Sequence, residues 1–272
     1  MRIAFFGDVV GRSGRETLIN YIENNKNRLK FDMIIVNGEN AAHGFGINQN
    51  ICNSFFNVGV DVITLGNHTF DQKDDMQLFD REKRLVRPLN YPKGTPGHGF
   101  YIHEIPSIGK KVMVINIMGR VFMELNNDPF QTIDELLSQY KIGYSVDVIF
   151  VDCHAEASAE KTALARYLDG RITALIGTHT HVPTSDLQIL KNGTGYLSDA
   201  GMCGDYDSII GMEEESSMKR FTQKVHAFAK MNPASKNATV CGVIIDVDNQ
   251  GKCTHLQTIR HGGFLIDQTT NI

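Results

Sequence analysis

Three apolar runs in the first quarter of the chain decide the fold: Ile3-Ala-Phe-Phe-Gly-Asp8, Met33-Ile-Ile-Val-Asn-Gly-Glu39 and Val62-Ile-Thr-Leu-Gly-Asn67. Each run is short and rich in β-branched or aromatic residues, as expected for a buried strand. Helical patterns near residues 14–25 and 48–57 separate the runs, so residues 2–65 should form strand, helix, strand, helix and strand. This order predicts a parallel sheet with right-handed crossovers.

The rest of the chain continues the alternation of strands and helices. Strands are predicted near residues 2–6, 33–37, 61–65, 100–105, 111–117, 146–152, 172–177, 194–198, 239–248 and 254–260. Helices are predicted near residues 14–25, 48–57, 72–81, 130–140, 157–169 and 213–229. Short turns at 106–109 and 249–251 predict antiparallel hairpins in the later part of the chain. We therefore expect a mixed α/β fold, a two-sheet sandwich flanked by helices, and a single domain over residues 1–272.

The composition is that of a globular protein, with 42% hydrophobic residues and a net charge of −4. This charge gives no general attraction to nucleic acid or anionic membranes, but it is compatible with a small phosphorylated substrate or a local basic patch. Neither a secretory signal nor an apolar stretch near the ~20 residues of a membrane span is visible. The five cysteines are odd in number and widely spread, as is typical of free thiols in a reducing compartment. We therefore expect a cytoplasmic protein without membrane contacts.

Side chains that can bind metals stand directly after five of the apolar runs, far apart in the sequence. They provide two acidic groups, one amide and three imidazoles: Asp8, Glu39, Asn67, His154, His179 and His181. In an open α/β sheet, ligands bind outside the carboxyl ends of the strands. In addition, side chains two residues apart, such as His179 and His181, share one face of a continuing strand. We expect these groups to meet in one pocket as a two-metal hydrolytic centre.

Taken one at a time, most of these residues have a plainer structural explanation. Asp8 alone suits a helix cap or a turn, and Glu39 alone suits a surface turn. The combination of an imidazole pair at one strand end with His154 at another favours metal binding over these alternatives. The donor atoms are oxygen and nitrogen without sulfur, which suits manganese, iron or zinc.

Four further residues are candidates for substrate contacts or proton transfer. His68, next to Asn67, would stand beside the centre, where a protonated imidazole can donate to a leaving oxygen, although a simple turn is the alternative. Arg12 precedes a helix start, where backbone N–H groups favour an anion, and Arg120 ends an apolar run. A surface salt bridge explains either arginine equally well. His43 lies in the glycine-rich loop after Glu39 and is a weaker candidate for substrate contact.

These motifs resemble those of the calcineurin-like metallophosphoesterases, specifically their YmdB-like branch, over nearly the whole chain. The matching stretches are Gly7-Asp-Val-Val-Gly11, Asn37-Gly-Glu-Asn-Ala-Ala42, Thr64-Leu-Gly-Asn-His-Thr-Phe-Asp71, Arg87-Pro-Leu-Asn-Tyr-Pro92, Asn116-Ile-Met-Gly-Arg120, Asp152-Cys-His-Ala-Glu156, Gly177-Thr-His-Thr-His-Val-Pro-Thr184 and Asp205-Tyr-Asp-Ser-Ile-Ile-Gly-Met212. The superfamily usually opens with Asp-x-His, but Val10 takes the histidine's place here, and Glu39 replaces the usual bridging aspartate. Both departures are shared by the YmdB-like branch and therefore support the narrower assignment.

The resemblance implies two metal ions with Glu39 between them. The residues implied around one ion are Asp8, Glu39 and His181, with Asn40 as an extra ligand, and those around the other are Glu39, Asn67, His154 and His179. It also implies hydrolysis of phosphodiester bonds, including those of 2′,3′-cyclic nucleotides, by a metal-bridging hydroxide, with His68 as the general acid.

Two alternative functions stay open at this point. A phosphomonoesterase such as a nucleotidase would use the same centre, with the shape of the pocket deciding between the two activities. A regulatory protein would instead hold a nucleotide or RNA with weak turnover, and the missing histidine at position 10 makes this worth testing. The sequence likewise leaves open RNA as a partner and assembly into a homo-oligomer.

Overall fold

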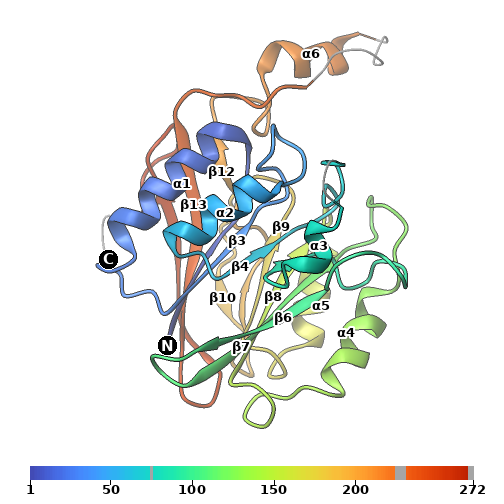
Figure 1. Ribbon diagram of the computed structural model, residues 1–272, viewed down its shortest axis with the longest axis vertical. Helices are drawn as coiled ribbons and strands as arrows, with labels where there is room; N and C mark the ends of the chain where they lie inside the picture. The colour runs from blue at the N-terminus through green and yellow to red at the C-terminus, as the bar shows by residue number, and fades with distance from the viewer. Residues whose placement is uncertain (74–75, 224–230, 269–272) are drawn as a thin grey trace.

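The computed structural model describes residues 1–73, 76–223 and 231–268. Two β-sheets pack face to face, and helices cover their outer sides (Figure 1). The chain first builds the parallel part of one sheet, then the whole of the second sheet, and finally returns to complete the first. Segments from both ends of the chain therefore lie side by side in the first sheet.

The first sheet has eight strands in the order β2-β12-β13-β1-β3-β4-β5, with β14 paired to β13. Their bounds are β1 (Arg2–Phe6), β2 (Asp8–Val9), β3 (Met33–Asn37), β4 (Val62–Thr64), β5 (Leu85–Val86), β12 (Met202–Asp205), β13 (Ala238–Val247) and β14 (Cys253–His261). Strands β1, β3, β4 and β5 are parallel to one another, whereas β13 runs antiparallel to both β1 and β14. The carboxyl ends of the parallel strands thus lie along one edge.

The second sheet has six strands in the order β10-β11-β9-β8-β7-β6. Their bounds are β6 (Phe100–Ile105), β7 (Lys110–Met118), β8 (Val148–His154), β9 (Ala174–Thr178), β10 (Gln188–Ile189) and β11 (Gly195–Leu197). Strands β7, β8, β9 and β11 are parallel, and the two edge strands are antiparallel to their neighbours. This sheet therefore has its own edge of strand carboxyl ends.

The described helices are α1 (Gly11–Asn25), α2 (Gln49–Val58), α3 (Leu78–Arg81), α4 (Pro129–Leu137), α5 (Ser158–Tyr167) and α6 (Glu214–Thr222). Two of them, α2 and α4, begin where a local side chain satisfies free backbone N–H groups. The Asn48 side chain accepts the Ile51 N–H at the start of α2, and Gly59 ends that helix with a φ of 104°. Asp128 caps α4 in the same way, just before Pro129 at the first helical position.

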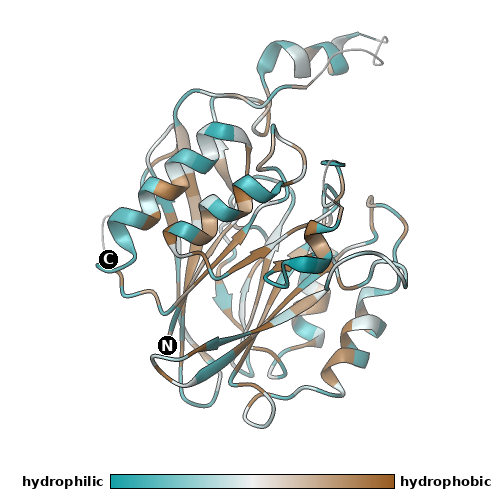
Figure 2. Ribbon diagram, in the orientation of Figure 1, coloured by the Kyte–Doolittle hydropathy of each residue, from teal (hydrophilic) through white to brown (hydrophobic). Residues whose placement is uncertain are grey.

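Strand side chains alternate between two cores. Ile3 and Phe5 of β1 point between the sheets, where they belong to the same buried cluster as Phe150 of β8. Ala4 and Phe6 face the opposite way, toward α1 and α2. Helices α4 and α5 cover the outer face of the second sheet in the same manner. Because both faces of each sheet are covered, the central strands are buried and mainly apolar (Figure 2).

The predicted fold class is confirmed, because the parallel core over residues 2–65, both hairpins and the two-sheet arrangement are all present. Four strands of two to four residues, namely β2, β5, β10 and β12, were not expected, since such short pairings leave no periodic pattern. The helix expected over residues 72–81 is wrong for 72–73 and 76–77, since only α3 is helical among the described residues of this range. Gln72 instead donates to the Phe45 carbonyl at 2.7 Å.

The other differences concern the ends of elements. The helix expected over 213–229 is observed as α6, and residues 224–229 of that expectation lie outside the described residues. All five cysteines are free and buried, as predicted, and Cys153 packs in the core of the second sheet. Among the described residues, no helix is both long and apolar enough to cross a membrane. The single domain over residues 1–272 stays a prediction.

The packing between the sheets should be the main source of stability. The ring of Phe150 is fully buried and lies 4.9 Å from the ring of Phe5 across the interface. We predict that Phe150→Ala lowers the free energy of unfolding by about 3–5 kcal/mol, because it removes this contact and leaves a cavity. Urea unfolding of the metal-free protein measures the effect. Phe122→Ala is the control, since Phe122 is 88% exposed and should change stability by less than about 0.5 kcal/mol.

Candidate metal centre

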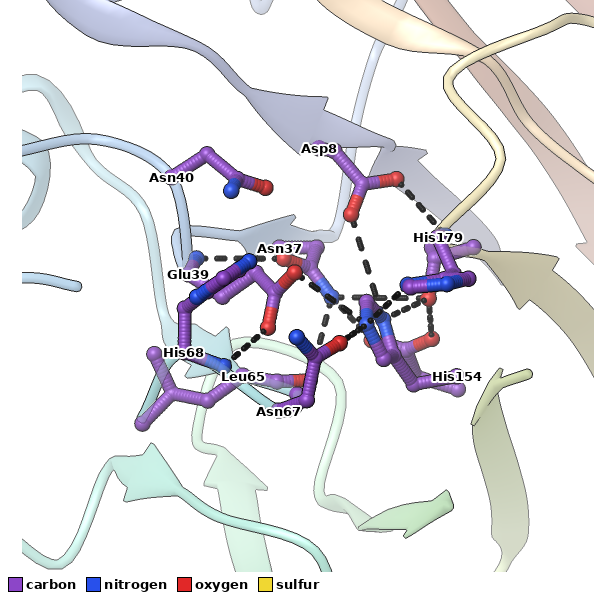
Figure 3. A network of polar contacts seen from close by, with 12 residues as sticks. Asp8, Asn37, Glu39, Asn40, Leu65, Asn67, His68, His154 and His179 are labelled. Carbon is purple, nitrogen blue, oxygen red and sulfur yellow. Dashed lines mark hydrogen bonds and ion pairs between the residues drawn. The ribbon is translucent and has the colours of Figure 1, made fainter. Parts of the chain in front are cut away.

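The carboxyl ends of the parallel strands in the two sheets meet at one place, and polar side chains converge there (Figure 3). Asp8 follows β1, Glu39 follows β3 and Asn67 follows β4, all from the first sheet. His154 is the last residue of β8, and His179 and His181 follow β9 in the second sheet. The structure thus brings together the six residues that the sequence singled out at strand ends.

Three of these side chains surround a single nitrogen atom of a fourth, His154. His154 Nε2 lies 2.9 Å from Asn67 Oδ1, 3.1 Å from Glu39 Oε1 and 3.1 Å from His179 Nδ1. The donor atoms offered by Glu39, His154 and His179 all lie within 4.8 Å of one another. Glu39 and His154 are almost completely buried, so solvent screens the interaction between them very little.

A second group of acceptors lies beside the first. Asp8 is fully buried; its Oδ2 accepts the His179 N–H at 3.1 Å, but its Oδ1 has no hydrogen-bond partner. His181 Nε2 lies 3.3 Å from Asn40 Oδ1, and the Asn40 amide nitrogen is occupied by the Gly44 carbonyl. A buried carboxylate oxygen without a partner is costly, and a bound cation would satisfy it.

The other nitrogen of each imidazole has a partner that fixes its proton. His154 Nδ1 donates to Thr178 Oγ1 at 2.9 Å, because the Thr178 hydroxyl itself donates to Asp152. His181 Nδ1 donates to the Ile210 carbonyl at 2.8 Å. His179 Nε2 lies 3.3 Å from a carboxylate oxygen of Glu156. When a ring is neutral, its second nitrogen therefore presents a lone pair to the centre, as in metal-binding histidines.

The charges of the buried groups favour a proton on His154 at the centre. Burial would raise the pKa of Glu39, but the positive charge and hydrogen bond of His154 lower it to about 2. Burial lowers the pKa of His154, but Glu39, together with Asp8 and Asp152, raises it to about 9. Burial and the charge of His154 lower the pKa of His179 to about 3. The metal-free centre therefore holds a proton on His154, facing atoms that are all acceptors.

Two backbone features allow the side chains to approach this closely. A Cβ atom on Gly66 would collide with Glu39 Oε2 and with His154 Nε2, so any larger residue would fill the space where these groups meet. His179 and His181 adopt positive φ values of 100° and 66°, and Ile210, which accepts from His181, has a φ of 46°. Non-glycine residues rarely adopt this conformation, and it clusters at functional sites.

His68 lies at the edge of the centre. Its backbone N–H donates to Glu39 Oε2 at 3.0 Å, and its ring nitrogen Nδ1 lies 2.7 Å from Asp71 Oδ2. The ring of Phe45 packs edge-on against it, with 5.0 Å between the ring centroids. A cavity of about 580 Å³ opens here. Its lining is Glu39, Asn40, Phe45, His68, Glu156, His179, Thr180, His181, Val182, Ile210, Met212, Arg220 and Met231.

The structure does not bring the other three candidates to this cavity. Arg12 is exposed and forms an ion pair with Glu16 one turn along α1 at 2.7 Å. Arg120 forms an ion pair with Asp128 at 3.3 Å. His43 is exposed, with a φ of 54°. For both arginines the alternative of a surface salt bridge is therefore the one observed.

Several supporting residues were missed by sequence analysis. Asp152 accepts from Thr178 at 2.7 Å and from Asn37 at 2.9 Å, and so fixes the partner of His154. Its signal was present, because Asp152 stands two residues before His154 and therefore shares its face of β8. Glu156 and the Ile210 carbonyl had no comparable signal, since their approach depends on how distant loops fold.

The fold and the set of donors together define a calcineurin-like metallophosphoesterase. The fold is that of the 5′-nucleotidase precursor from Thermus thermophilus, with a TM-score of 0.59 and 13% identity over 97% of this chain and 54% of that one. The structure of a novel phosphatase from Mycoplasma pneumoniae is more similar, with a TM-score of 0.89 and 33% identity over 96% of this chain and 93% of that one.

Within this class, the chain belongs to the YmdB-like protein family, whose model matches residues 4–259. A relative from Bacillus subtilis (strain 168), the 2′,3′-cyclic-nucleotide 2′-phosphodiesterase, is 46% identical over 252 residues, which cover 93% of each chain. The predicted family is thereby confirmed. Val10, at the position of the missing histidine, packs with Met202 and Met212 in a small apolar cluster.

The proton on His154 gives a direct test of the centre. Because the pKa of His154 is about 9, the metal-free protein carries this proton at pH 7 and must lose it when the imidazole binds a cation. We predict that Mn²⁺ binding at pH 7 releases about one proton per chain, and that the release fades as the pH rises through the pKa of His154. Titration calorimetry in two buffers of different ionisation enthalpy measures it. Identical heats in both buffers at pH 7 would contradict the assignment.

Proposed function

We propose that this chain is a phosphodiesterase that uses two metal ions and acts on 2′,3′-cyclic nucleotides. The proposal rests on one observation: hydrogen-bond acceptor atoms from five strand ends lie close together, with fewer protons than acceptors between them. Membership of the YmdB-like family and the name of the Bacillus subtilis relative support the choice of substrate.

We assign the residues of the centre to two cation positions that share Glu39. Asn67, His154 and His179 would hold one ion with Glu39, and Asp8 and His181 would hold the other, with Asn40 as an additional oxygen ligand. Oxygen and imidazole donors without sulfur suit manganese, iron or zinc. When bound, such ions lower the pKa of water and offset the charge of a phosphoryl group.

His68 would act as the general acid. Asp71, 2.7 Å from Nδ1, holds the ring in place, and the backbone N–H of His68 donates to Glu39. Because His68 also lines the cavity, its other nitrogen can reach the oxygen that leaves the phosphorus atom. A cyclic nucleotide needs this proton, since its leaving group is a ribose alkoxide.

The cavity suits a nucleoside. Its volume is in the range of small-molecule sites, and one wall is apolar. Val182 and Ile210 on this wall are about half exposed, and Phe45, Met212 and Met231, which also line the cavity, belong to one small apolar cluster. We assign the nucleobase to this wall and the phosphate to the centre. Arg12, His43 and Arg120 are not part of the proposal. RNA binding, self-association and a cytoplasmic location stay predictions.

Replacing the acid should affect substrates according to their leaving groups. We predict that His68→Ala lowers kcat for 2′,3′-cyclic AMP about 10²–10⁴-fold, the usual contribution of general acid catalysis. The loss with bis-p-nitrophenyl phosphate should be far smaller, because nitrophenolate leaves without a proton. Steady-state kinetics on both substrates, with metal content measured alongside, makes the comparison. Equal losses on the two substrates would remove His68 from the acid role.

The apolar wall should affect the binding of the nucleotide and not the rate of the chemical step. We predict that Val182→Ser raises KM for 2′,3′-cyclic AMP several-fold, with kcat for methyl p-nitrophenyl phosphate, which has no base, unchanged. Val121→Ser is the matched control, since Val121 is 44% exposed and Val182 is 52% exposed, but only Val182 lines the cavity. AMP is included in the panel. If AMP were hydrolysed faster than the cyclic nucleotide, the chain would be a phosphomonoesterase.

A further inference from the structure

A completely buried ion pair lies beneath the segment that carries His179 and His181. Lys161 on α5 and Asp199, which follows β11, are each 1% exposed, and Lys161 Nζ lies 2.9 Å from Asp199 Oδ2. Neither residue lines the cavity. A buried ion pair rarely adds stability compared with apolar residues of similar size, because both charges lose their hydration. The contacts of this pair therefore point to a purpose other than stability.

Most of the side-chain contacts of this pair go to the chain around His179. Lys161 Nζ also donates to the Thr178 carbonyl at 2.7 Å, directly before His179. Asp199 Oδ2 accepts the Thr180 N–H at 3.0 Å, directly after His179, and the Thr180 hydroxyl at 2.8 Å. The second oxygen, Asp199 Oδ1, accepts the Gly201 N–H at 2.9 Å. The peptide groups on both sides of His179 are thus held by opposite members of one pair.

His179 needs such support because of its backbone conformation. Its φ of 100° is one that residues with a side chain seldom adopt, and such strain persists only where the surroundings impose it. The same conformation places His179 Nδ1 3.1 Å from His154 Nε2 and its N–H 3.1 Å from Asp8. Gly177 has no space for a side chain, since a Cβ there would collide with the Ser198 carbonyl oxygen and lie 2.8 Å from Lys161 Cδ.

We propose that Lys161 and Asp199 form a positioning pair that holds the backbone on both sides of His179 and so directs its Nδ1 into the metal centre. The inference rests on the proposed function in one respect, namely that His179 is a metal ligand. Both residues act through His179 and not on the substrate. The pair therefore sets the affinity of the centre for its cation.

The test separates metal affinity from folding. The double variant Lys161→Met with Asp199→Leu replaces the pair by apolar residues of similar size. We expect its Kd for Mn²⁺, measured by calorimetry on the metal-free protein, to rise about 10–100-fold, as for other residues that orient metal ligands. The Tm of the metal-free variant should fall, because the Thr178 carbonyl and the Thr180 and Gly201 N–H groups lose their partners, so Kd is compared at a temperature at which both proteins are folded.

The matched control is Thr173→Val. Thr173 is 1% exposed, directly precedes β9 at its far end, and donates to the Gly251 carbonyl at 2.7 Å, but it does not touch the segment of His179. Its Kd for Mn²⁺ should equal that of the parent even if its Tm falls. An increase in Kd as large as that of the double variant would reduce the pair to a general structural role and overturn the inference.

The remaining outcomes are also decisive. If the parent chain binds no Mn²⁺, Fe²⁺ or Zn²⁺, the proposed function fails before the pair is tested. If the parent binds and the double variant binds with the same Kd, the positioning pair is refuted. Should the double variant not fold, Asp199→Asn keeps the size of the side chain and weakens the pair. We then expect a raised Kd and an altered visible absorption of bound Co²⁺, and unchanged values of both would refute the inference.

Discussion

The rest of this structure depends on one constraint. Buried hydrogen-bond acceptor atoms face one another at the centre, and there are too few protons to pair them all. Asp8 Oδ1 has no hydrogen-bond partner, and His154 Nε2 is surrounded by Asn67, Glu39 and His179 at 2.9–3.1 Å. Such an arrangement is unfavourable in an apolar interior unless positive charge enters it. The fold must therefore be stable enough elsewhere to hold these groups together, and the two apolar cores on either side of each sheet provide that stability.

The surrounding structure supports the centre by fixing protons and backbone. Asp152, acting through Thr178, and the Ile210 carbonyl hold the outer nitrogens of His154 and His181. Gly66 leaves the space in which Glu39 and His154 approach each other. These features place imidazole lone pairs and carboxylate oxygens in advance, so that little reorganisation accompanies the arrival of a cation. The apolar wall with Val182 and Ile210 is built from the same loop segments.

Most of the fold and the position of the centre could be predicted from the sequence, for a physical reason. Parallel strands buried on both faces appear as continuous apolar runs, and their ends are visible where a polar residue such as Asp8 or His154 follows. The surroundings of Arg12 and Arg120 could not be predicted. An arginine near a helix start or a strand end has the same local sequence pattern whether it faces solvent or a substrate. Lys161 and Asp199 escaped notice because a buried lysine looks like any solvated helix residue until its partner is known.

The division of the ligands between the two sheets has a consequence for how the protein is made. Asp8, Glu39 and Asn67 are translated early and belong to the first sheet, whereas His154, His179 and His181 are translated late and belong to the second. No nascent chain shorter than about two thirds of the full length can assemble the ring of donors, so an ion captured there must arrive after both halves have docked. Once seated, the ion would cross-link the halves, and any shear of one sheet along the other would have to break its coordination.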